Sequence, residues 1–413
     1  MIQFQQWELN NGLKVLLHED PNTPLVTVNL MYNVGAKEED PKQTGLAHLF
    51  EHLMFSGSKN AKNFDGVLQK AGGENNAFTS NDLTNYYITI PKENIETALW
   101  LEADRMQDLD LTQESLDVQK KVVIEEFKQR YFNQPYGDVW LKLRPLCYKN
   151  HPYQWPTIGK SIEQIESVTL NDALNFYRRF YAPNNASLSI AGNISKAECE
   201  VLVTKYFNEK QAAKINRKEF TFEKEQTEKR TSSIEADVPF NAIYMAFHTE
   251  EKDSTGYYTA DLLTDVLSGG SSSRFYTSLV KEKQLFSEIN AYLTGETHPG
   301  LLVISGKISE GVSFEKAEKG IWDEIQKLNL TGLVDKELEK VINKKLTAEV
   351  YSEMQALNKA IKLAFYATID QLDRINDGMK RLQSISEKDL LDYVSSHLIE
   401  SKSNVLYYSK KKD

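Results

Sequence analysis

The chain has 413 residues, of which 40% are hydrophobic and 10% aromatic, so it can build packed cores and is not a disordered protein. Its formal charge of −10 at pH 7 argues against a nucleic-acid-binding protein, which would need a basic surface. No apolar run approaches the roughly 18 residues of a membrane-spanning helix, and the length favours two domains of about 200 residues each.

The amino terminus, MIQFQQWELNNG, has neither the basic region nor the apolar core of a signal peptide. We therefore expect a cytoplasmic protein as the sequence stands, or a periplasmic or exported one if a leader has been removed. Cys147 and Cys199 are 52 residues apart and lack metal-site spacing, so we expect them to be free thiols in a core.

Two β-rich runs open the chain, residues 13–18 and 25–34. They flank the turn-forming residues 19–22, a pattern typical of an antiparallel hairpin or meander.

The next segment, TGLAHLFEHLMFS at residues 44–56, contains His48, Glu51 and His52. On a helix these three side chains share one face. Two imidazoles spaced i, i+4 can hold one Zn²⁺, and the carboxylate between them can hold a water molecule. The pattern is H-x-x-E-H, the reverse of the commoner H-E-x-x-H. The alternative is an accidental cluster on a solvated face, but only about 0.02 such matches are expected by chance, and the apolar neighbours favour burial.

A short helix is expected at residues 63–70, ending at Gly72 and Gly73. Residues 74–90 then alternate in polarity and are rich in Thr and Tyr, which is typical of strands. The polar residues at the start of this stretch favour a sheet edge that accepts an extended peptide as an added strand. An edge strand protected from aggregation only by its polar residues is the alternative.

Two helices are predicted at residues 91–106 and 114–130. In the second, one stripe at helical spacing contains Leu116, Gln119, Val122, Val123, Glu126 and Phe127. Glu126 is therefore an acid on the apolar face, whereas Glu125 has Lys121 four residues earlier and can form a surface ion pair. A buried carboxylate costs several kcal/mol unless its charge is compensated. A divalent metal would compensate it, so Glu126 is the predicted third ligand and Glu125 the reserve.

The rest of the chain predicts a second domain similar to the first. Residues 1–212 form the predicted N-terminal domain, 213–232 a charged linker, and 233–413 the C-terminal domain. The stretch 257–270 matches the H-x-x-E-H helix at an offset of 212, which places Ala260, Leu263 and Thr264 where His48, Glu51 and His52 stand. We expect a degenerate repeat without metal ligands. The alternative is two unrelated halves that share only generic helix patterns.

Five blocks in order, GLAHLFEHLMFSGS, AGGENNAFTSNDLTNYY, VVIEE, HPYQWPTIG and FYAPNNASLSIAGN, resemble the M16 or pitrilysin-type zinc peptidases, the inverzincins, and in length the chain is similar to their processing-peptidase branch. The resemblance implies an α+β fold of two homologous domains, each an antiparallel sheet packed with helices. It also implies a clamshell around unfolded peptide, formed with a homologous chain or as a homodimer.

The resemblance carries roles onto single residues of this chain. It implies zinc ligands at His48, His52 and Glu126, and the general base at Glu51. It also implies that the edge segment with Asn76 and Ala77 holds the substrate backbone. Where family members commonly have another Glu, this chain has Gln119, which can still hydrogen-bond around the metal but lends less basicity to its partner.

One departure concerns the second half. Active members carry an Arg and, seven residues later, a Tyr that hold substrate, and here these positions are Lys281 and Glu288. We therefore expect a zinc endopeptidase subunit whose homologous partner supplies Arg and Tyr. A non-hydrolytic assembly subunit of the same fold is the alternative, and general peptide turnover is not distinguished from the maturation of one peptide.

Overall fold

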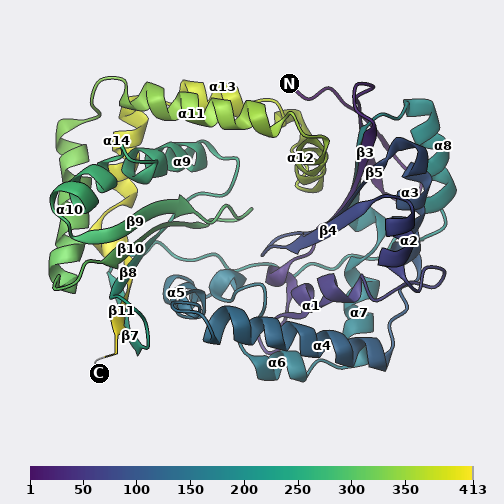
Figure 1. Cartoon of the computed structure of the whole chain (residues 1–413), viewed down its shortest axis with the longest axis horizontal. Helices are drawn as coiled ribbons and strands as arrows, with labels where there is room; N and C mark the ends of the chain where they lie inside the picture. The colour runs from purple at the N-terminus through teal and green to yellow at the C-terminus, as the bar shows by residue number, and fades with distance from the viewer. Residues whose placement is uncertain (412–413) are drawn as a thin grey trace. The chain divides into compact units, whose positions relative to one another are not determined.

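The computed structural model describes residues 1–411 (Figure 1). No helix in this part of the chain is both long and apolar enough to cross a bilayer. The chain forms two compact units, each assembled from three segments. Unit 1 contains Met1–Phe127, Trp155–Phe220 and Val350–Asn376, and unit 2 contains Lys128–Gln154, Thr221–Glu349 and the described residues from Asp377 onward. The predicted domain boundaries at residues 212 and 233 separate two similar halves of the sequence, whereas these units are defined by contacts. Those boundaries therefore stay a prediction.

Unit 1 is built on a six-stranded sheet in the order β1-β2-β6-β3-β5-β4. Its strands are β1 (Gln5–Glu8), β2 (Lys14–Glu19), β3 (Leu25–Tyr32), β4 (Glu74–Thr79), β5 (Thr84–Pro91) and β6 (Ala186–Gly192). Neighbours pair antiparallel except β2 and β6, which run parallel. The predicted hairpin between residues 13–18 and 25–34 is wrong, because β6 lies between these strands and pairs with both.

Helices cover both faces of this sheet. The helices of unit 1 are α1 (Leu46–Leu53), α2 (Phe64–Lys70), α3 (Ile95–Gln107), α4 (Gln113–Phe127), α6 (Ile162–Glu166), α7 (Leu170–Phe180), α8 (Lys196–Phe207) and α12 (Ala356–Thr368). Of these, α1, α3, α8 and α12 pack on the strands. Every residue of β6 is buried, and because side chains alternate between faces, both faces must be covered. Figure 1 shows α12 on one side of the sheet and α3 and α8 on the other.

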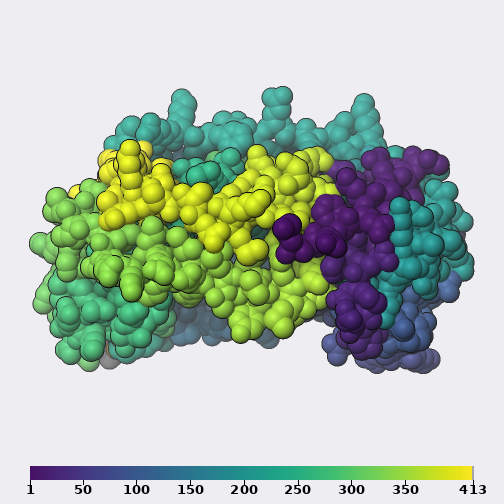
Figure 2. Space-filling model, turned by 90° about the horizontal axis from the view of Figure 1, so that it is seen from above, coloured from purple at the N-terminus to yellow at the C-terminus, as the bar shows by residue number. Residues whose placement is uncertain are grey.

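Helix α12 belongs to unit 1 although it lies late in the chain. It packs on β2, β3 and β6, and the Ser189 hydroxyl on β6 donates a hydrogen bond of 2.6 Å to the Ala360 carbonyl. The backbone N–H of Ile2 donates to Asn376 Oδ1 at 2.7 Å, and Figure 2 shows the N-terminal residues in purple against late residues in yellow-green. Unit 1 is therefore completed by a segment that the predicted domain boundaries assign to the second half.

Unit 2 is built on a five-stranded sheet in the order β7-β11-β8-β10-β9. Its strands are β7 (Arg230–Ala236), β8 (Ala242–His248), β9 (Phe286–Leu293), β10 (Leu301–Ile308) and β11 (Asn404–Lys410), and its helices are α5 (Val139–Cys147), α9 (Thr255–Ser268), α10 (Phe314–Thr331), α11 (Glu337–Ser352), α13 (Gly378–Ser384) and α14 (Glu387–His397). Alternate residues of β8 enter different cores: Ile243, Met245 and Phe247 pack with α9, and Ala242 and Ala246 pack with α5.

The two sheets repeat one topology. Strands β2-β6-β3-β5-β4 and β7-β11-β8-β10-β9 correspond in order, and in each set the first pair is parallel and the rest antiparallel. Helix α1 follows β3 as α9 follows β8. The fold is thus α+β with two similar halves, as predicted, and each sheet is antiparallel apart from one parallel pair.

Candidate metal centre

Helix α1 begins at a backbone conformation that only glycine adopts without strain. Gly45, the residue before the helix, has φ of 91°. The buried carboxylate of Glu39 accepts hydrogen bonds from Gly45 N–H at 3.0 Å and Ala47 N–H at 2.8 Å, which satisfies donors that a helix leaves open at its N-terminus. The buried Leu49 and Phe50 then fix α1 in the core, so the opposite face is held rigidly.

That face presents His48 and His52, whose rings lie edge to face with centroids 4.9 Å apart. Glu126 of α4 lies against both: its Oε1 is 3.7 Å from His48 Nε2, and its Oε2 is 3.4 Å from His52 Nε2. One donor atom from each of the three residues falls within 4.8 Å of the others. The structure therefore brings Glu126 of α4 against His48 and His52 of α1, which precede it in the sequence by 78 and 74 residues.

Helix α4 positions Glu126 through its buried residues Leu116, Val123 and Phe127. Glu126 is half-buried beside this stripe, whereas Glu125 is exposed and lies outside the three-donor group. Gln119, two turns before Glu126, is half-buried.

Glu51 completes the helical face from within α1. Its Oε2 accepts a hydrogen bond of 2.5 Å from the Thr79 hydroxyl. Thr79 ends β4, which stands last in the sheet order and pairs only with β5 among the strands of the described sheet. Asn76 and Ala77 lie in the same strand, opposite Tyr87 and Tyr86 of β5. The structure thus places the predicted base beside the predicted peptide-binding edge.

The three donors fit a zinc ion. Zinc in proteins is tetrahedral with metal–nitrogen and metal–oxygen distances of about 2.0–2.1 Å, which places its ligand atoms about 3.3–3.4 Å from one another. The separations of 3.4 Å and 3.7 Å at Glu126 are close to this edge length. Two neutral imidazoles and one carboxylate are also a known donor set for catalytic zinc, which keeps the fourth position for water or substrate.

The corresponding helices of unit 2 are joined by ion pairs instead. Asp265 of α9 lies 2.8 Å from Lys344 Nζ and 3.3 Å from Lys345 Nζ, both on α11. Asp261, one turn earlier on α9, lies 2.7 Å from Lys345 Nζ. Among residues 1–411, the group of His48, His52 and Glu126 is the one set of metal-type donors that converges. The second half thus keeps the helix pair without the predicted ligands.

The two substituted positions of unit 2 lie on or beside strand β9. Lys281 is exposed in the helical turn 276–282. Glu288 is exposed on β9 and forms an ion pair of 3.0 Å with Lys307 on the adjacent strand β10. This pairing lowers the pKa of Glu288 below its ordinary value, mainly through the hydrogen bond from Lys307, so the side chain is an acceptor at neutral pH and cannot replace a phenol donor.

Two residues around the centre were not predicted from the sequence. Thr79 contacts α1 from 28 residues further along the chain, and Glu39 contacts it from the loop six to eight residues before the N–H groups that donate to it. Neither has a spacing that relates it to the H-x-x-E-H motif. The block around Asn76 includes Thr79, which is the one signal that could have indicated it.

Comparison with protein families gives two matches. Residues 14–157 match the model described as Insulinase (Peptidase family M16), and residues 167–345 match the model described as Peptidase M16 inactive domain. The first range contains His48, Glu51, His52 and Glu126, and the second contains α9 and the first part of α11.

Individual known proteins are also similar to this chain. Zinc protease PqqE of Helicobacter pylori is 28% identical over 410 residues, which cover 97% of this chain and 91% of that protein. A probable mitochondrial-processing peptidase subunit beta of Schizosaccharomyces pombe is 30% identical over 201 residues, 48% of this chain and 44% of that protein. The crystal structure of a protease from Helicobacter pylori has a TM-score of 0.92 at 24% identity and covers 99% of this chain and 100% of its own.

Proposed function

The chain belongs to peptidase family M16, and from this premise we propose that it is a zinc-dependent endopeptidase that cleaves unfolded peptides or oligopeptides. The observation that carries the proposal is the convergence of His48, His52 and Glu126 beside Glu51. Relatives named as zinc proteases support the identity of the metal.

Each residue at the centre has a separate role in this proposal. His48, His52 and Glu126 would hold the ion. Zinc, when bound, makes water more acidic and polarises a carbonyl group. Glu51 accepts the proton of the attacking water and delivers it to the amine that leaves, as a general base and then a general acid.

Substrate would be held by the free edge of β4. An extended peptide that pairs with this edge would have its backbone fixed along Asn76 and Ala77. The edge ends at Thr79, which touches Glu51, so a peptide paired there would lie next to the proposed base.

Two substitutions in the second half of the chain are the reason for proposing a partner. Because Lys281 and Glu288 stand where active members of the family have Arg and Tyr, we propose that a homologous chain supplies these two groups in a heterodimer. In a homodimer, other groups such as Tyr292 of β9, which is 37% exposed, would hold the substrate, and slower cleavage is then expected. The alternative function is a non-hydrolytic assembly subunit of the same fold, and the match of residues 167–345 to an inactive domain fits both functions.

Metal analysis and peptide hydrolysis test both candidates. We expect about one zinc per chain and turnover of unstructured peptides that rises on co-expression with an M16 homologue carrying Arg and Tyr. Glu51→Gln should keep the zinc and abolish turnover, because it removes the base and not a ligand. Full activity of the isolated chain would remove the need for a partner, and failure to bind zinc would leave the assembly role.

A further inference from the structure

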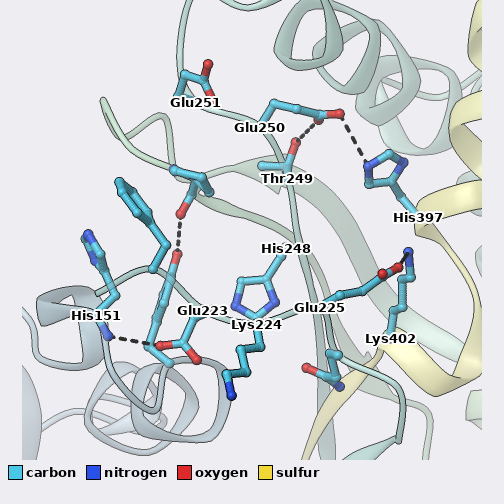
Figure 3. Close-up of a pocket in the computed structure, with 14 residues that line it drawn as sticks. His151, Glu223, Lys224, Glu225, His248, Thr249, Glu250, Glu251, His397 and Lys402 are labelled. Carbon is cyan, nitrogen blue, oxygen red and sulfur yellow. Dashed lines mark hydrogen bonds and ion pairs between the residues drawn. The ribbon is translucent and has the colours of Figure 1, made fainter. Parts of the chain in front are cut away.

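A cavity of about 300 Å³ lies within unit 2 (Figure 3). Its lining comes from the chain after α5, the segment 222–226, the end of β8 and helix α14. Three of the chain's seven histidines, His151, His248 and His397, line it. No residue of the H-x-x-E-H centre contributes to this lining, so the cavity needs an explanation of its own.

Glu223 is a fixed carboxylate in this wall. One of its oxygens, Oε1, accepts hydrogen bonds from three consecutive backbone N–H groups, those of Lys149 at 2.8 Å, Asn150 at 2.6 Å and His151 at 2.9 Å. Burial raises the pKa of Glu223, but these three hydrogen bonds and the nearby His248 outweigh it, so the pKa is lower than usual. Glu223 is therefore an anion at neutral pH.

His248 is a buried acceptor next to it. Its imidazole ring hydrogen-bonds the Cys147 carbonyl, and within residues 1–411 its buried Nε2 has no hydrogen-bond partner. Nδ1 is thus the atom that donates to the carbonyl. Burial lowers the pKa of His248 to about 4, so the ring is neutral at pH 7 and Nε2 carries a lone pair. Figure 3 shows this ring in the middle of the lining, beside Glu223.

The other charged groups of the lining are mostly paired with each other. Glu250 lies 3.3 Å from the Nε2 of His397, and Glu225 forms an ion pair of 2.8 Å with Lys402. The apolar part of the wall is aromatic: Tyr148, whose ring lies edge to face with His248 at 5.3 Å, and Phe222. Lys224 and Glu251 also line the cavity but are exposed, so the fixed groups of the wall are one anion, one neutral acceptor and flat apolar surface.

We propose that this cavity binds a small organic cation, with an amidinium, guanidinium or ammonium group that donates to Glu223 and His248 and an apolar body that lies on Tyr148 and Phe222. A fixed carboxylate and an unpaired nitrogen acceptor are together matched by a ligand with at least two N–H donors, whereas an anionic ligand would meet the Glu223 carboxylate and the lone pair of His248. A metal ion does not fit, because the donor atoms of this wall form no converging group of three among the described residues.

Benzamidine is a suitable probe, because it joins a flat amidinium to a phenyl ring. Calorimetric titration of the zinc-loaded full chain should give one benzamidine site, with benzamide and benzoate binding at least tenfold more weakly. Glu223→Gln should weaken benzamidine binding at least tenfold. Glu251→Gln is the matched control, because Glu251 lines the same cavity but is exposed, and it should change binding less than twofold.

Two further measurements keep the test independent of folding and of the metal centre. In the unmodified protein, the ¹⁵N resonance of His248 Nε2 should shift on saturation with benzamidine, and His52→Ala should bind it as the wild type does. The binding affinities of agmatine and of a blocked tripeptide containing arginine should be compared. The tighter binder shows whether the cationic group belongs to a free small molecule or to a peptide side chain. Equal binding of benzoate, equal binding by Glu223→Gln, or no binding at millimolar benzamidine would overturn the proposal.

Discussion

Thr79 of β4 donates its hydroxyl hydrogen bond to the Oε2 atom of Glu51 on α1, over 2.5 Å. The contact joins the edge strand, where substrate is proposed to pair, to the proposed base. Thr79→Val keeps the shape of the side chain and removes the donor, so we expect kcat to fall about tenfold or more, within the range attributed to general-base catalysis, with a smaller change in KM. Steady-state hydrolysis of a fluorogenic peptide measures both.

Thr79→Ser is the matched variant, because it restores the hydroxyl without the methyl group. It should recover most of the lost kcat at unchanged zinc content. Equal losses in the two variants would show that the packing of Thr79 matters and its hydrogen bond does not.

Zinc occupancy should distinguish the roles of Glu125 and Glu126, which are neighbours on α4. Glu126→Gln removes the one carboxylate that lies against both imidazoles and should reduce zinc content at least several-fold after dialysis. Glu125→Gln alters an exposed side chain outside the donor group and should leave zinc content within error of the wild type. Atomic absorption on the dialysed proteins measures the difference, and the opposite ranking would assign the third ligand to Glu125.

The sequence predicted the helix of His48 and His52 and the side of α4 that carries Glu126 because both follow from local periodicity. It predicted the stripe on α4 imperfectly: Val122 was expected to lie with Leu116 and Val123, yet it is 45% exposed. A stripe as wide as that can rotate by one position without changing its pattern, so only the contact with α1 decides which side chains are buried.

Pairing between segments that are far apart in the sequence could not be predicted from local patterns. The turn at residues 19–22 favoured a hairpin, but β6, more than 150 residues later, separates β2 from β3. The packing of α12 on the first sheet has the same origin, since nothing within residues 356–368 indicates which half they join. The contact of Thr79 with Glu51, 28 residues apart, was missed for this reason too.

Glu39 should make folding stability depend on pH. Burial raises its pKa from 4.5 to about 8, so between these values the folded state binds more protons than the unfolded state, and stability falls as pH rises. The slope reaches at most about 1.4 kcal/mol per pH unit. Glu39→Gln cannot ionise and should lack this decline. Urea unfolding of the metal-free proteins from pH 4.5 to 9 tests the point, and parallel curves for the two proteins would contradict it.

The ion pairs of unit 2 should stabilise the helix pair that has no metal ligands. Lys345 is 25% exposed and contacts both Asp261 and Asp265, whereas Lys344 is 55% exposed and contacts only Asp265. Lys345→Met leaves the buried Asp265 and the half-buried Asp261 with less compensation, so it should lower the unfolding free energy by about 1–3 kcal/mol, between the values for exposed and buried pairs. Lys344→Met should cost under about 1 kcal/mol.

The pH dependence of this effect follows from Lys345. Burial lowers its pKa, but Asp261 and Asp265 outweigh burial and raise the pKa above its ordinary 10.5. Its contribution is therefore complete below pH 10.5 and is lost only above that value, so the difference between Lys345→Met and wild type should stay constant from pH 6 to 9 in urea unfolding. Zinc content should not change in either variant, because the ligands lie in unit 1. Equal stability of the two lysine variants would mean that Lys345 does not join α9 to α11 electrostatically.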